Sequence, residues 1–296
     1  MEHVQWSSRP TLRSPVLIAA FTGWNDAGDA ASAAVRHLIE AWHAEHVAAL
    51  DPEEFYDFGT TRPLVHLAEG VTREIVWPPN DLWAASTPGT DVLLLLGTEP
   101  QLKWRTFCRQ ITAIAAEQET TLVLTLGALL ADVAHSRPVS LIGTATDQAL
   151  IDRFRLARSR YEGPTGIVGA LHDACAGAGL PSASLWAAVP AYAPGVDSPK
   201  AALALVERAS AIVGAPVGMR ALEGAVSDYE DEVAELVAAD DDLAGYVGRL
   251  EAMSDDEDDE VADDDDEEPG DRSAPDATVE QFVEDVERFL RDQGRD

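Results

Sequence analysis

The sequence predicts an α/β protein, a three-layer α/β/α sandwich with a mostly parallel central sheet. The first observation behind this prediction is that short, continuous apolar runs alternate with stretches whose apolar residues recur at helical spacing. The second is that several of these runs end in a polar turn that contains glycine. A continuous apolar run is typical of a strand that helices cover on both faces, as in a parallel sheet.

The clearest strand-turn-helix unit lies near the N-terminus. Val16–Phe21 is a continuous apolar run and is predicted to be a buried strand. Thr22–Asp29 is a polar turn, and Ala30–Trp42 carries apolar residues at helical spacing. Asn25 or Asp26 is expected to cap this helix, because short polar side chains accept hydrogen bonds from the free N–H groups at a helix start.

Similar units follow along the chain. Further strands are predicted at Val92–Leu96, Thr121–Leu126, Val139–Ile142 and Ser184–Val189. Further helices are predicted at Gln101–Glu117, Ala128–Ala134, Gln148–Arg160, Ile167–Ala178 and Pro199–Val213. Residues 51–79 are less regular, with aromatic and β-branched clusters between Gly and Pro breaks, and they predict one or two strands and a long loop.

The chain divides into five predicted segments. Residues 1–14 are an extension over the surface, and residues 15–218 form the α/β domain. Residues 219–253 form a helical hairpin that packs on this domain or on another subunit. Residues 254–277 are rich in Asp and Glu and cannot bury enough apolar surface to fold, so they are expected to form a disordered linker. Residues 278–292 carry apolar side chains at helical spacing and form a tethered amphipathic helix.

The net charge of the 296-residue chain is −32, and half of it lies in the acidic C-terminal segment. An acidic protein repels phosphate backbones and anionic lipids, so neither nucleic acid nor a membrane surface is expected as a partner. There is no basic-then-apolar leader and no apolar run of roughly 20 residues, so we expect a cytoplasmic protein. Cys108 and Cys175 have apolar neighbours and are expected to be buried, reduced thiols.

Four glycine-containing turns mark the candidate ligand site: Thr22–Gly28, Gly97–Pro100, Gly127 and Gly143–Asp147. Turns that follow parallel strands meet at one edge of a sheet, where ligands bind beyond the carboxyl ends of the strands. The residues expected to line this crevice are Trp24, Asn25, Asp26, Glu99, Arg105 and Thr144. Alternatively, the glycines only turn the chain, the polar side chains cap the next helices, and Arg105 pairs with Glu99 or Asp26 instead of binding an anion.

Recognisable catalytic and cofactor signatures are absent from the sequence. There is no phosphate-binding loop of the G-x-x-x-x-G-K-[ST] type, and the first turn, GWNDAG, lacks the spacing of a dinucleotide-binding loop. There is no G-x-S-x-G nucleophile elbow, and no histidine pairs with Cys or carboxylates at metal-ligand spacing. We therefore assign no catalytic, cofactor-binding or metal-binding residue.

Seven stretches, taken in order, resemble the PAC2 family, the proteasome assembly chaperone 2-like proteins, and most closely its actinobacterial branch. They are FTGWNDAGDAAS (21–32), GTEPQLKWRTF (97–107), TLGALLADVAHSRP (125–138), GTATD (143–147), SRYEGPTGIVGALHDAC (159–175), SLWAAVPAY (184–192) and SPKAALALV (198–206). Any one of these motifs is weak, but seven in order are specific. The resemblance extends from about residue 15 to residue 253.

The resemblance implies an α/β/α fold similar to the nucleoside phosphorylase/hydrolase type and self-association, for which trimers are known in the bacterial branch. Through eukaryotic and archaeal relatives it also implies help in assembling proteasome particles. It supplies no agreed catalytic residues. Relatives that act on proteasome rings can engage them through a C-terminal hydrophobic-Tyr-X motif, whereas this chain ends in Gln293–Asp296, so docking by the same tail is not expected.

Two functional hypotheses follow from the sequence. The leading one is a non-enzymatic, self-associating PAC2-type protein, a proteasome-related assembly chaperone or adaptor, whose acidic tail and terminal helix contact partners. The alternative is a small-molecule enzyme or sensor of the phosphorylase/hydrolase-like type, which uses the crevice lined by Asn25, Asp26, Glu99 and Thr144. Paired carboxylates could do general acid/base work there if burial raised the pKa of one of them.

Overall fold

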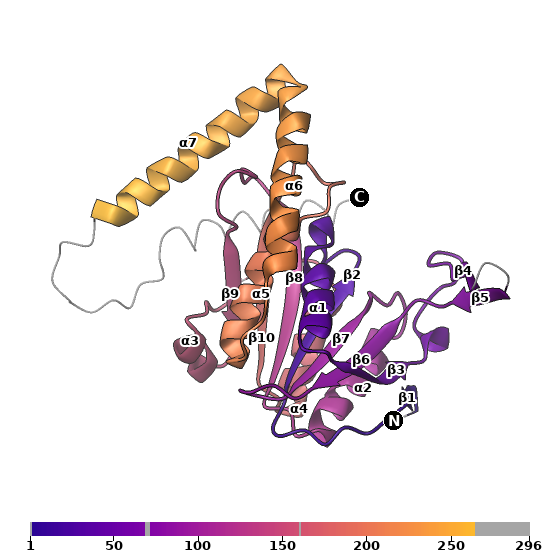
Figure 1. Cartoon of the computed structure of the whole chain (residues 1–296). Helices are drawn as coiled ribbons and strands as arrows, with labels where there is room; N and C mark the ends of the chain where they lie inside the picture. Colours follow the sequence, from indigo (N-terminus) through magenta and orange to yellow (C-terminus); the bar gives the residue numbers. More distant parts are fainter. Residues whose placement is uncertain (1, 69–71, 160, 264–296) are drawn as a thin grey trace.

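The computed structural model describes residues 2–68, 72–159 and 161–263. A central sheet lies between two layers of helices, and two further helices extend beyond one end of the sheet (Figure 1). The predicted α/β class is confirmed. No helix in this part of the chain is both long enough and apolar enough to cross a membrane.

The central sheet is mixed, with a parallel centre and antiparallel edges. Its strand order is β1-β3-β6-β7-β2-β8-β10-β9, and the adjacent strands from β7 to β10 run parallel. The bounds are β1 (Val4–Trp6), β2 (Val16–Thr22), β3 (Glu45–Leu50), β6 (Asn80–Ala85), β7 (Val92–Thr98), β8 (Leu122–Ala131), β9 (Leu141–Ala145) and β10 (Ser182–Pro190). A separate antiparallel hairpin consists of β4 (Leu64–Ala68) and β5 (Thr72–Val76).

Helices cover both faces of this sheet. On one face, α1 and α5 share an apolar cluster with the strands, and on the other face α2 and α4 share a second cluster. The continuous apolar run of β2 serves both clusters, because Ile18 and Ala20 belong to the first and Leu17 and Phe21 to the second. The bounds are α1 (Ala30–Ala41), α2 (Trp104–Glu117), α3 (Gln148–Phe154), α4 (Ile167–Ala178) and α5 (Pro199–Val213).

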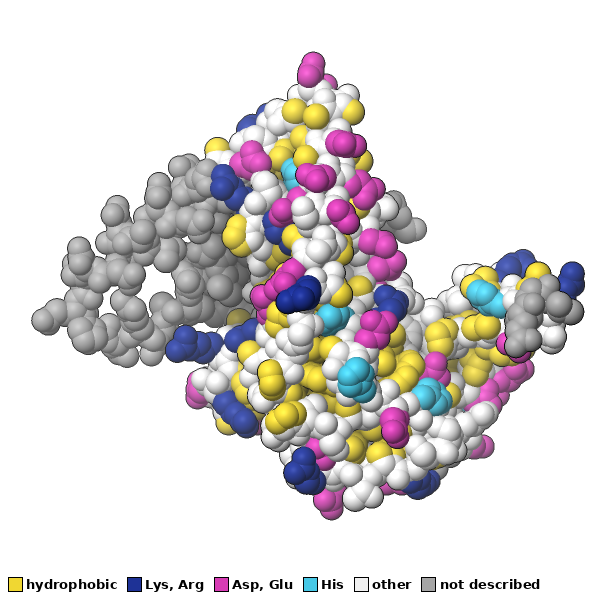
Figure 2. All heavy atoms as spheres, in the orientation of Figure 1, with side chains coloured by type: hydrophobic (Ala, Val, Ile, Leu, Met, Phe, Trp, Pro, Cys, Tyr) yellow, Lys and Arg dark blue, Asp and Glu magenta, His cyan; other side chains and the backbone are white. Residues whose placement is uncertain are grey.

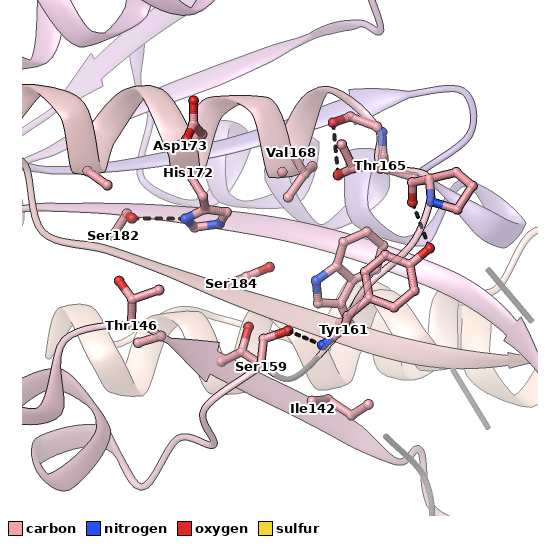
Figure 3. Close-up of a pocket in the computed structure, with 18 of the residues that line it drawn as sticks. Ile142, Thr146, Ser159, Tyr161, Thr165, Val168, His172, Asp173, Ser182 and Ser184 are labelled. Atoms are coloured by element: carbon pink, nitrogen blue, oxygen red, sulfur yellow. Dashed lines mark hydrogen bonds between the residues drawn. The ribbon is translucent and has the colours of Figure 1, made fainter. Parts of the chain in front are cut away.

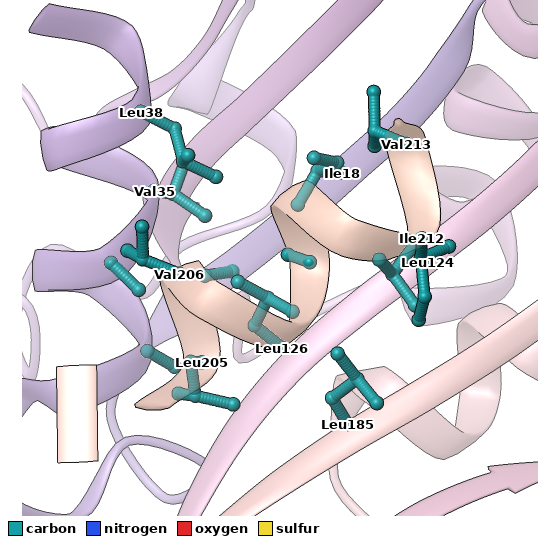
Figure 4. Close-up of a cluster of buried hydrophobic side chains, with 14 of the residues drawn as sticks. Ile18, Val35, Leu38, Leu124, Leu126, Leu185, Leu205, Val206, Ile212 and Val213 are labelled. Atoms are coloured by element: carbon teal, nitrogen blue, oxygen red, sulfur yellow. The ribbon is translucent and has the colours of Figure 1, made fainter. Parts of the chain in front are cut away.

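The first cluster fixes α1 and α5 against each other as well as against the sheet. Val35 and Leu38 of α1 lie beside Val206 of α5, and Leu124 of β8 belongs to the same cluster (Figure 4). Small side chains permit this close approach, since Ala202 and other buried alanines line the two helices where they meet.

The predicted helix Ala128–Ala134 is wrong, because strand β8 continues through Gly127 to Ala131. Its residues pair in parallel with β10 as far as Ala131, opposite Pro190. Alanine and leucine favour helix in isolation, but a ladder to a buried neighbouring strand outweighs that preference. The helix predicted to reach Arg160 is also shorter, and it ends at Phe154 because Arg155 adopts a left-handed conformation (φ 51°).

Three antiparallel strands have positions that the sequence pattern did not predict. Residues 4–6, expected to lie over the surface, form β1 and pair antiparallel with β3. Strands β3 and β6 also lie outside the predicted runs, and together they extend the sheet beyond β7. Each of these strands has exposed or half-buried residues, so each carries mixed polar and apolar side chains and no continuous apolar run.

The predicted C-terminal hairpin consists of α6 (Arg220–Ala238) and α7 (Asp241–Asp263). Tyr229 and Val233 of α6 pack near Ala193, and Val247 of α7 packs near Ala134, so the hairpin rests on the loops of the α/β domain. Helix α7 continues into the segment predicted to be a disordered acidic linker, which has no Pro or Gly before Pro269 to stop it. The amphipathic helix predicted at 278–292 lies outside the described residues.

Both cysteines are free and buried, as the sequence predicts. Burial raises the pKa of the Cys108 thiol to about 12 and that of the Cys175 thiol to about 11. A thiol with such a raised pKa is an inert member of the apolar core.

Candidate functional site

The turn after β2 separates two cavities. Gly23 begins the turn with φ 119°, a conformation that other residues rarely adopt, and the Asp26 N–H donates to its carbonyl at 3.1 Å. Asn25 and Asp26 then line different cavities, while the partly exposed Trp24 indole lines both. The turn is therefore the wall between a cavity beside α4 and a second cavity beside the start of α1.

Asp26, one of the two caps that the sequence predicts, caps helix α1. Its Oδ1 accepts hydrogen bonds from the backbone N–H groups of Ala31 at 2.7 Å and Ser32 at 3.1 Å. Asp26 is 5% exposed, and burial raises the pKa of its carboxyl group above the ordinary value, against the lowering effect of the bonds from Ser32 and Ala31. Oδ1 thus satisfies two N–H groups at the helix start, while Oδ2 is buried without a hydrogen-bond partner among the described residues.

Glu99 ties together the ends of β2, β7 and α4. Its Oε1 accepts from Asn25 Nδ2 at 2.9 Å and from the Ile167 N–H at 2.8 Å, which is the first N–H of α4. Its own N–H donates to the Thr22 carbonyl at 2.9 Å. Glu99 is therefore a structural acceptor at a helix N-terminus, and it is absent from the walls of both cavities.

Replacing Glu99 with Ala is expected to lower the free energy of unfolding by about 2 kcal/mol, because two enclosed donors lose their acceptor. Urea unfolding measures the change. The matched control is Glu40→Ala, on the exposed face of α1, which should change stability by less than about 0.5 kcal/mol. Equal effects of the two substitutions would contradict the role of Glu99 as the acceptor that joins Asn25 to the start of α4.

The cavity beside α4 has a volume of about 380 Å³ and lies between α4, β9, β10 and the loop before α4. Figure 3 shows Val168 and His172 descending from α4, with Ser184 of β10 and Ile142 of β9 across from them. Its described walls are formed by Trp24, Asn25, Ile142, Thr144, Ala145, Thr146, Ser159, Tyr161, Pro164, Thr165, Gly166, Val168, Gly169, His172, Asp173, Ala176, Ser182, Ser184 and Trp186. A volume of this size is in the range of sites for small organic molecules.

A row of hydroxyl residues crosses three strands beneath α4, and two of them, Thr144 and Ser184, line this cavity. Ser184 of β10 pairs with Thr144 of β9 on one side and with Thr125 of β8 on the other, so the three side chains share one face of the sheet. His172 of α4 lies above them, with Nε2 at 2.8 Å from Thr125 Oγ1 and Nδ1 at 2.9 Å from Ser182 Oγ.

The His172 imidazole joins α4 to β8 and β10 through its two hydrogen bonds, and it is unsuited to proton transfer. Burial lowers its pKa from the ordinary 6.5 to about 4, so it is neutral at physiological pH. In a Ser-His-Asp triad a carboxylate stabilises the imidazolium, whereas here a Thr125 hydroxyl occupies that position. The Ser182–His172 pair consequently lacks the charge partner that general-base catalysis would need.

The structure places the predicted site residues in four different settings. Trp24, Asn25 and Thr144 line the cavity beside α4. Asp26 lines the other cavity, which is also bordered by Asp29. Glu99 caps α4, and Arg105 lies exposed on α2, where it pairs with neither Glu99 nor Asp26 in the described residues. The predicted crevice is thus split by the turn that was expected to form its centre.

The predicted convergence of four turns is correct for two of them. The turns after β2 and β7 meet at one edge, because Thr22 pairs with Thr98 in parallel strands. Gly127 lies inside β8, and the Gly143–Asp147 turn lies at the other end of the sheet, since β9 is antiparallel to β10 and Ala145 pairs with Ala183. Thr144 reaches the cavity along the face of the sheet instead of from its edge.

A family model described as the PAC2 family matches residues 20–237 of the chain. The chain belongs to the PAC2 family. A PAC2 family protein from Streptomyces avermitilis is 44% identical, with a TM-score of 0.73, and the match covers 79% of this chain and 99% of that one. A proteasome-assembly chaperone homologue from Mycobacterium tuberculosis is 43% identical, with a TM-score of 0.71 and coverage of 78% and 99%.

A more distant solved structure shares the fold alone. An archaeal proteasome activator from Pyrococcus furiosus is 18% identical, with a TM-score of 0.66, and the match covers 80% of this chain and 99% of that one. A comparison with curated proteins found no match.

The sequence patterns above do not indicate that His172, Ser184 and Trp186 line the cavity beside α4. A signal was present in β10, where Ser182, Ser184 and Trp186 alternate with Ala183 and other small or apolar residues. A strand buried on both faces would carry apolar residues on each of them, so this alternation indicates one polar face. In the described part of this PAC2 chain, no group of three or more His, Cys, Asp or Glu side chains could hold a metal ion.

Proposed function

We propose that this chain is a non-enzymatic, self-associating protein that acts as a proteasome-related assembly chaperone or adaptor. Family membership and the 43% identical Mycobacterium tuberculosis relative, which is named a proteasome-assembly chaperone homologue, support this proposal. The engagement of Asp26 and Glu99 in helix capping also supports it, because carboxylates that accept backbone hydrogen bonds are poorly placed for acid/base catalysis.

The observation that carries self-association is the apolar arm, which we define as strands β4 and β5 together with Trp77. It projects from the side of the α/β domain (Figure 1), and Figure 2 shows apolar side chains over its surface. Its exposed fractions are 61% for Leu64, 60% for Val65, 60% for Leu67, 57% for Ile75, 45% for Val76 and 44% for Trp77. Exposed apolar groups clustered in this way mark interaction surfaces.

Both faces of the apolar arm expose apolar side chains to water. Leu64 pairs with Val76 on one face, and the adjacent residues Val65 and Ile75 pair on the other. An isolated two-stranded hairpin is marginally stable in water, and this one is anchored at its root by the Phe58 ring, whose centroid lies 4.7 Å from that of Trp77. A partner that encloses the arm would remove both apolar faces from water.

A second copy of this chain fits the apolar arm on grounds of charge. Copies that each carry a net charge of −32 repel one another over most of their surface. The described residues of the two arm strands include a single acid, Glu74, and it is accompanied by Arg73. The arm is therefore a place where two acidic copies can approach closely and bury apolar area.

The double substitution Val65→Glu with Ile75→Lys tests the self-association of the arm. It keeps a cross-strand pair but makes one apolar face charged, so light scattering is expected to show a fall from oligomer to monomer mass at equal concentration. Melting temperature should stay within about 2 °C, because the replaced side chains are exposed. Leu102→Glu, at a 45% exposed site outside the arm, is the matched control and should leave the mass unchanged.

An unchanged mass in the arm variant would exclude the arm as the interface, and a monomeric wild type would refute self-association itself. The assembly role has a separate test, which is recovery of proteasome subunits or a related factor with tagged protein from its own cells at low salt. Failure of the wild type to recover any such subunit would overturn the chaperone or adaptor role, whatever the oligomeric state.

A further inference from the structure

We propose that the cavity between α4, β9 and β10 binds an uncharged aromatic small molecule that carries hydrogen-bonding groups. This function is additional to the assembly role, because the cavity lies under α4, on the opposite face of the sheet from α1 and α5, and is bordered by no residue of the apolar arm. Three features support this proposal. The face of β10 towards α4 carries serines instead of apolar residues, two buried polar atoms have no hydrogen-bond partner among the described residues, and the described walls include aromatic rings but no Lys or Arg.

The two faces of β10 differ in composition, one apolar and the other partly polar. Towards α5, the strand presents Ala183, Leu185 and Ala187, which belong to the apolar core. Towards α4, it presents Ser182 and Ser184 before Trp186. Close packing of a helix on a sheet is achieved with apolar residues, so serines in this row do not serve packing. They serve instead to present hydroxyl groups to the cavity.

Two polar atoms of the cavity residues lack partners among the described residues. Ser184 is 3% exposed and its Oγ has no hydrogen bond, while Asn25 is 1% exposed and its Oδ1 has none. The amide orientation of Asn25 is fixed, because its Nδ2 must face the Glu99 carboxylate. Figure 3 shows Ser184 in the space between α4 and β9. Buried polar atoms without partners are unfavourable, and a ligand with a donor and an acceptor would satisfy them.

The walls select aromatic and uncharged ligands. Trp24, Tyr161 and Trp186 each present a ring to the cavity. The Trp186 ring lies directly on Gly127 of the next strand, where an added Cβ would come within 2.6 Å of the ring carbons, so glycine is needed for this ring position. None of the described wall residues is Lys or Arg, His172 is neutral, and Asp173 is acidic, so these residues would offer an anionic ligand no counter-charge.

Saturation-transfer NMR with paired probes tests the proposal on the full chain. Each pair differs in charge at a single group: indole-3-acetamide with indole-3-acetate, 4-hydroxybenzamide with 4-hydroxybenzoate, and adenosine with adenosine monophosphate. At millimolar concentration, at least one neutral probe is expected to bind, and its anionic counterpart to bind about tenfold more weakly. Failure of every neutral probe, or equal binding of each pair, would overturn the proposal.

Two substitutions at Ser184 test whether the probes bind in this cavity. Ser184→Ala removes the hydroxyl but keeps the space, and it is expected to weaken the neutral probe about threefold to tenfold. Ser184→Leu fills the space and should abolish binding, with far-UV circular dichroism verifying that the variant is folded. Ser210→Ala, at a buried serine of α5, is the matched control and should bind as the wild type does.

The melting temperature of the ligand-free Ser184→Ala variant is a second measurement. It distinguishes a serine that serves a ligand from one that only stabilises the fold. The ligand-free variant is expected to melt at the same temperature as the wild type or higher, because a buried hydroxyl without a partner is lost. Wild-type binding by the Ser184→Leu variant, or a lower melting temperature of the ligand-free Ser184→Ala variant, would overturn the assignment. Neither result would bear on self-association or on the recovery of proteasome subunits.

Discussion

Acidification from pH 6.5 to pH 4 is expected to remove about 3 kcal/mol of folding free energy through His172 alone, because burial lowers its pKa from 6.5 to about 4. Above pH 6.5 the imidazole is neutral in both states and contributes no pH dependence. Between pH 6.5 and about 4 the unfolded chain binds a proton that the folded chain does not, so stability falls as pH falls. Below about pH 4 both states are protonated, and this loss stops growing.

The measurement is urea unfolding at a series of pH values for the wild type and for His172→Gln. The glutamine variant lacks the titrating group, so its stability should fall less steeply over this window, whatever its absolute stability. Exposed His43→Gln is the matched control and should reproduce the wild-type slope. Parallel pH profiles for the wild type and His172→Gln would show that His172 is not the buried neutral group described above.

Replacing Phe107 with Ala is expected to destabilise the protein by about 3–5 kcal/mol, the range for a large aromatic side chain deleted from a packed core. Phe107 of α2 is fully buried and makes edge-to-face contacts with two rings. Its centroid lies 5.9 Å from that of Phe21 in β2 and 5.2 Å from that of Phe55 in the loop after β3. One ring thus joins a helix, a central strand and the loop that carries the apolar arm.

Thermal and urea unfolding of Phe107→Ala should therefore show a large fall in both midpoints. The matched control is Leu102→Ala just before α2, which removes an apolar side chain that is 45% exposed and should cost less than about 1 kcal/mol. A Phe107→Ala variant as stable as this control would mean that the ring cluster does not hold α2 on the sheet.

The candidate site was predictable only in its parts. The polar turn before an apolar helical pattern predicts that Asn25 or Asp26 caps α1, and in the structure Asp26 does so by accepting from the Ala31 N–H. The partner of Asn25 could not be deduced, because Glu99 lies 74 positions along the chain and meets it only through the pairing of β2 with β7. Likewise, no local pattern places His172 above Thr125, since strand order decides which helix covers which strand.

The sequence by itself determined the α/β class, the central strands and the principal helices. Apolar periodicity and turn residues depend only on residues that are close in the sequence. They predict a strand correctly where the segment is buried on both faces, as in Val16–Phe21. It did not determine strand direction at the edges, and the antiparallel course of β9 therefore moved the Gly143–Asp147 turn to the opposite end of the sheet.

The tertiary structure alone decided that β8 continues past Gly127, because pairing with β10 outweighs the local helix preference of Ala128–Ala134. It also decided that the polar face of β10 and the His172 side of α4 enclose a cavity. Both outcomes depend on contacts between residues far apart in the chain, and the free energy of those contacts is set by which strands become neighbours.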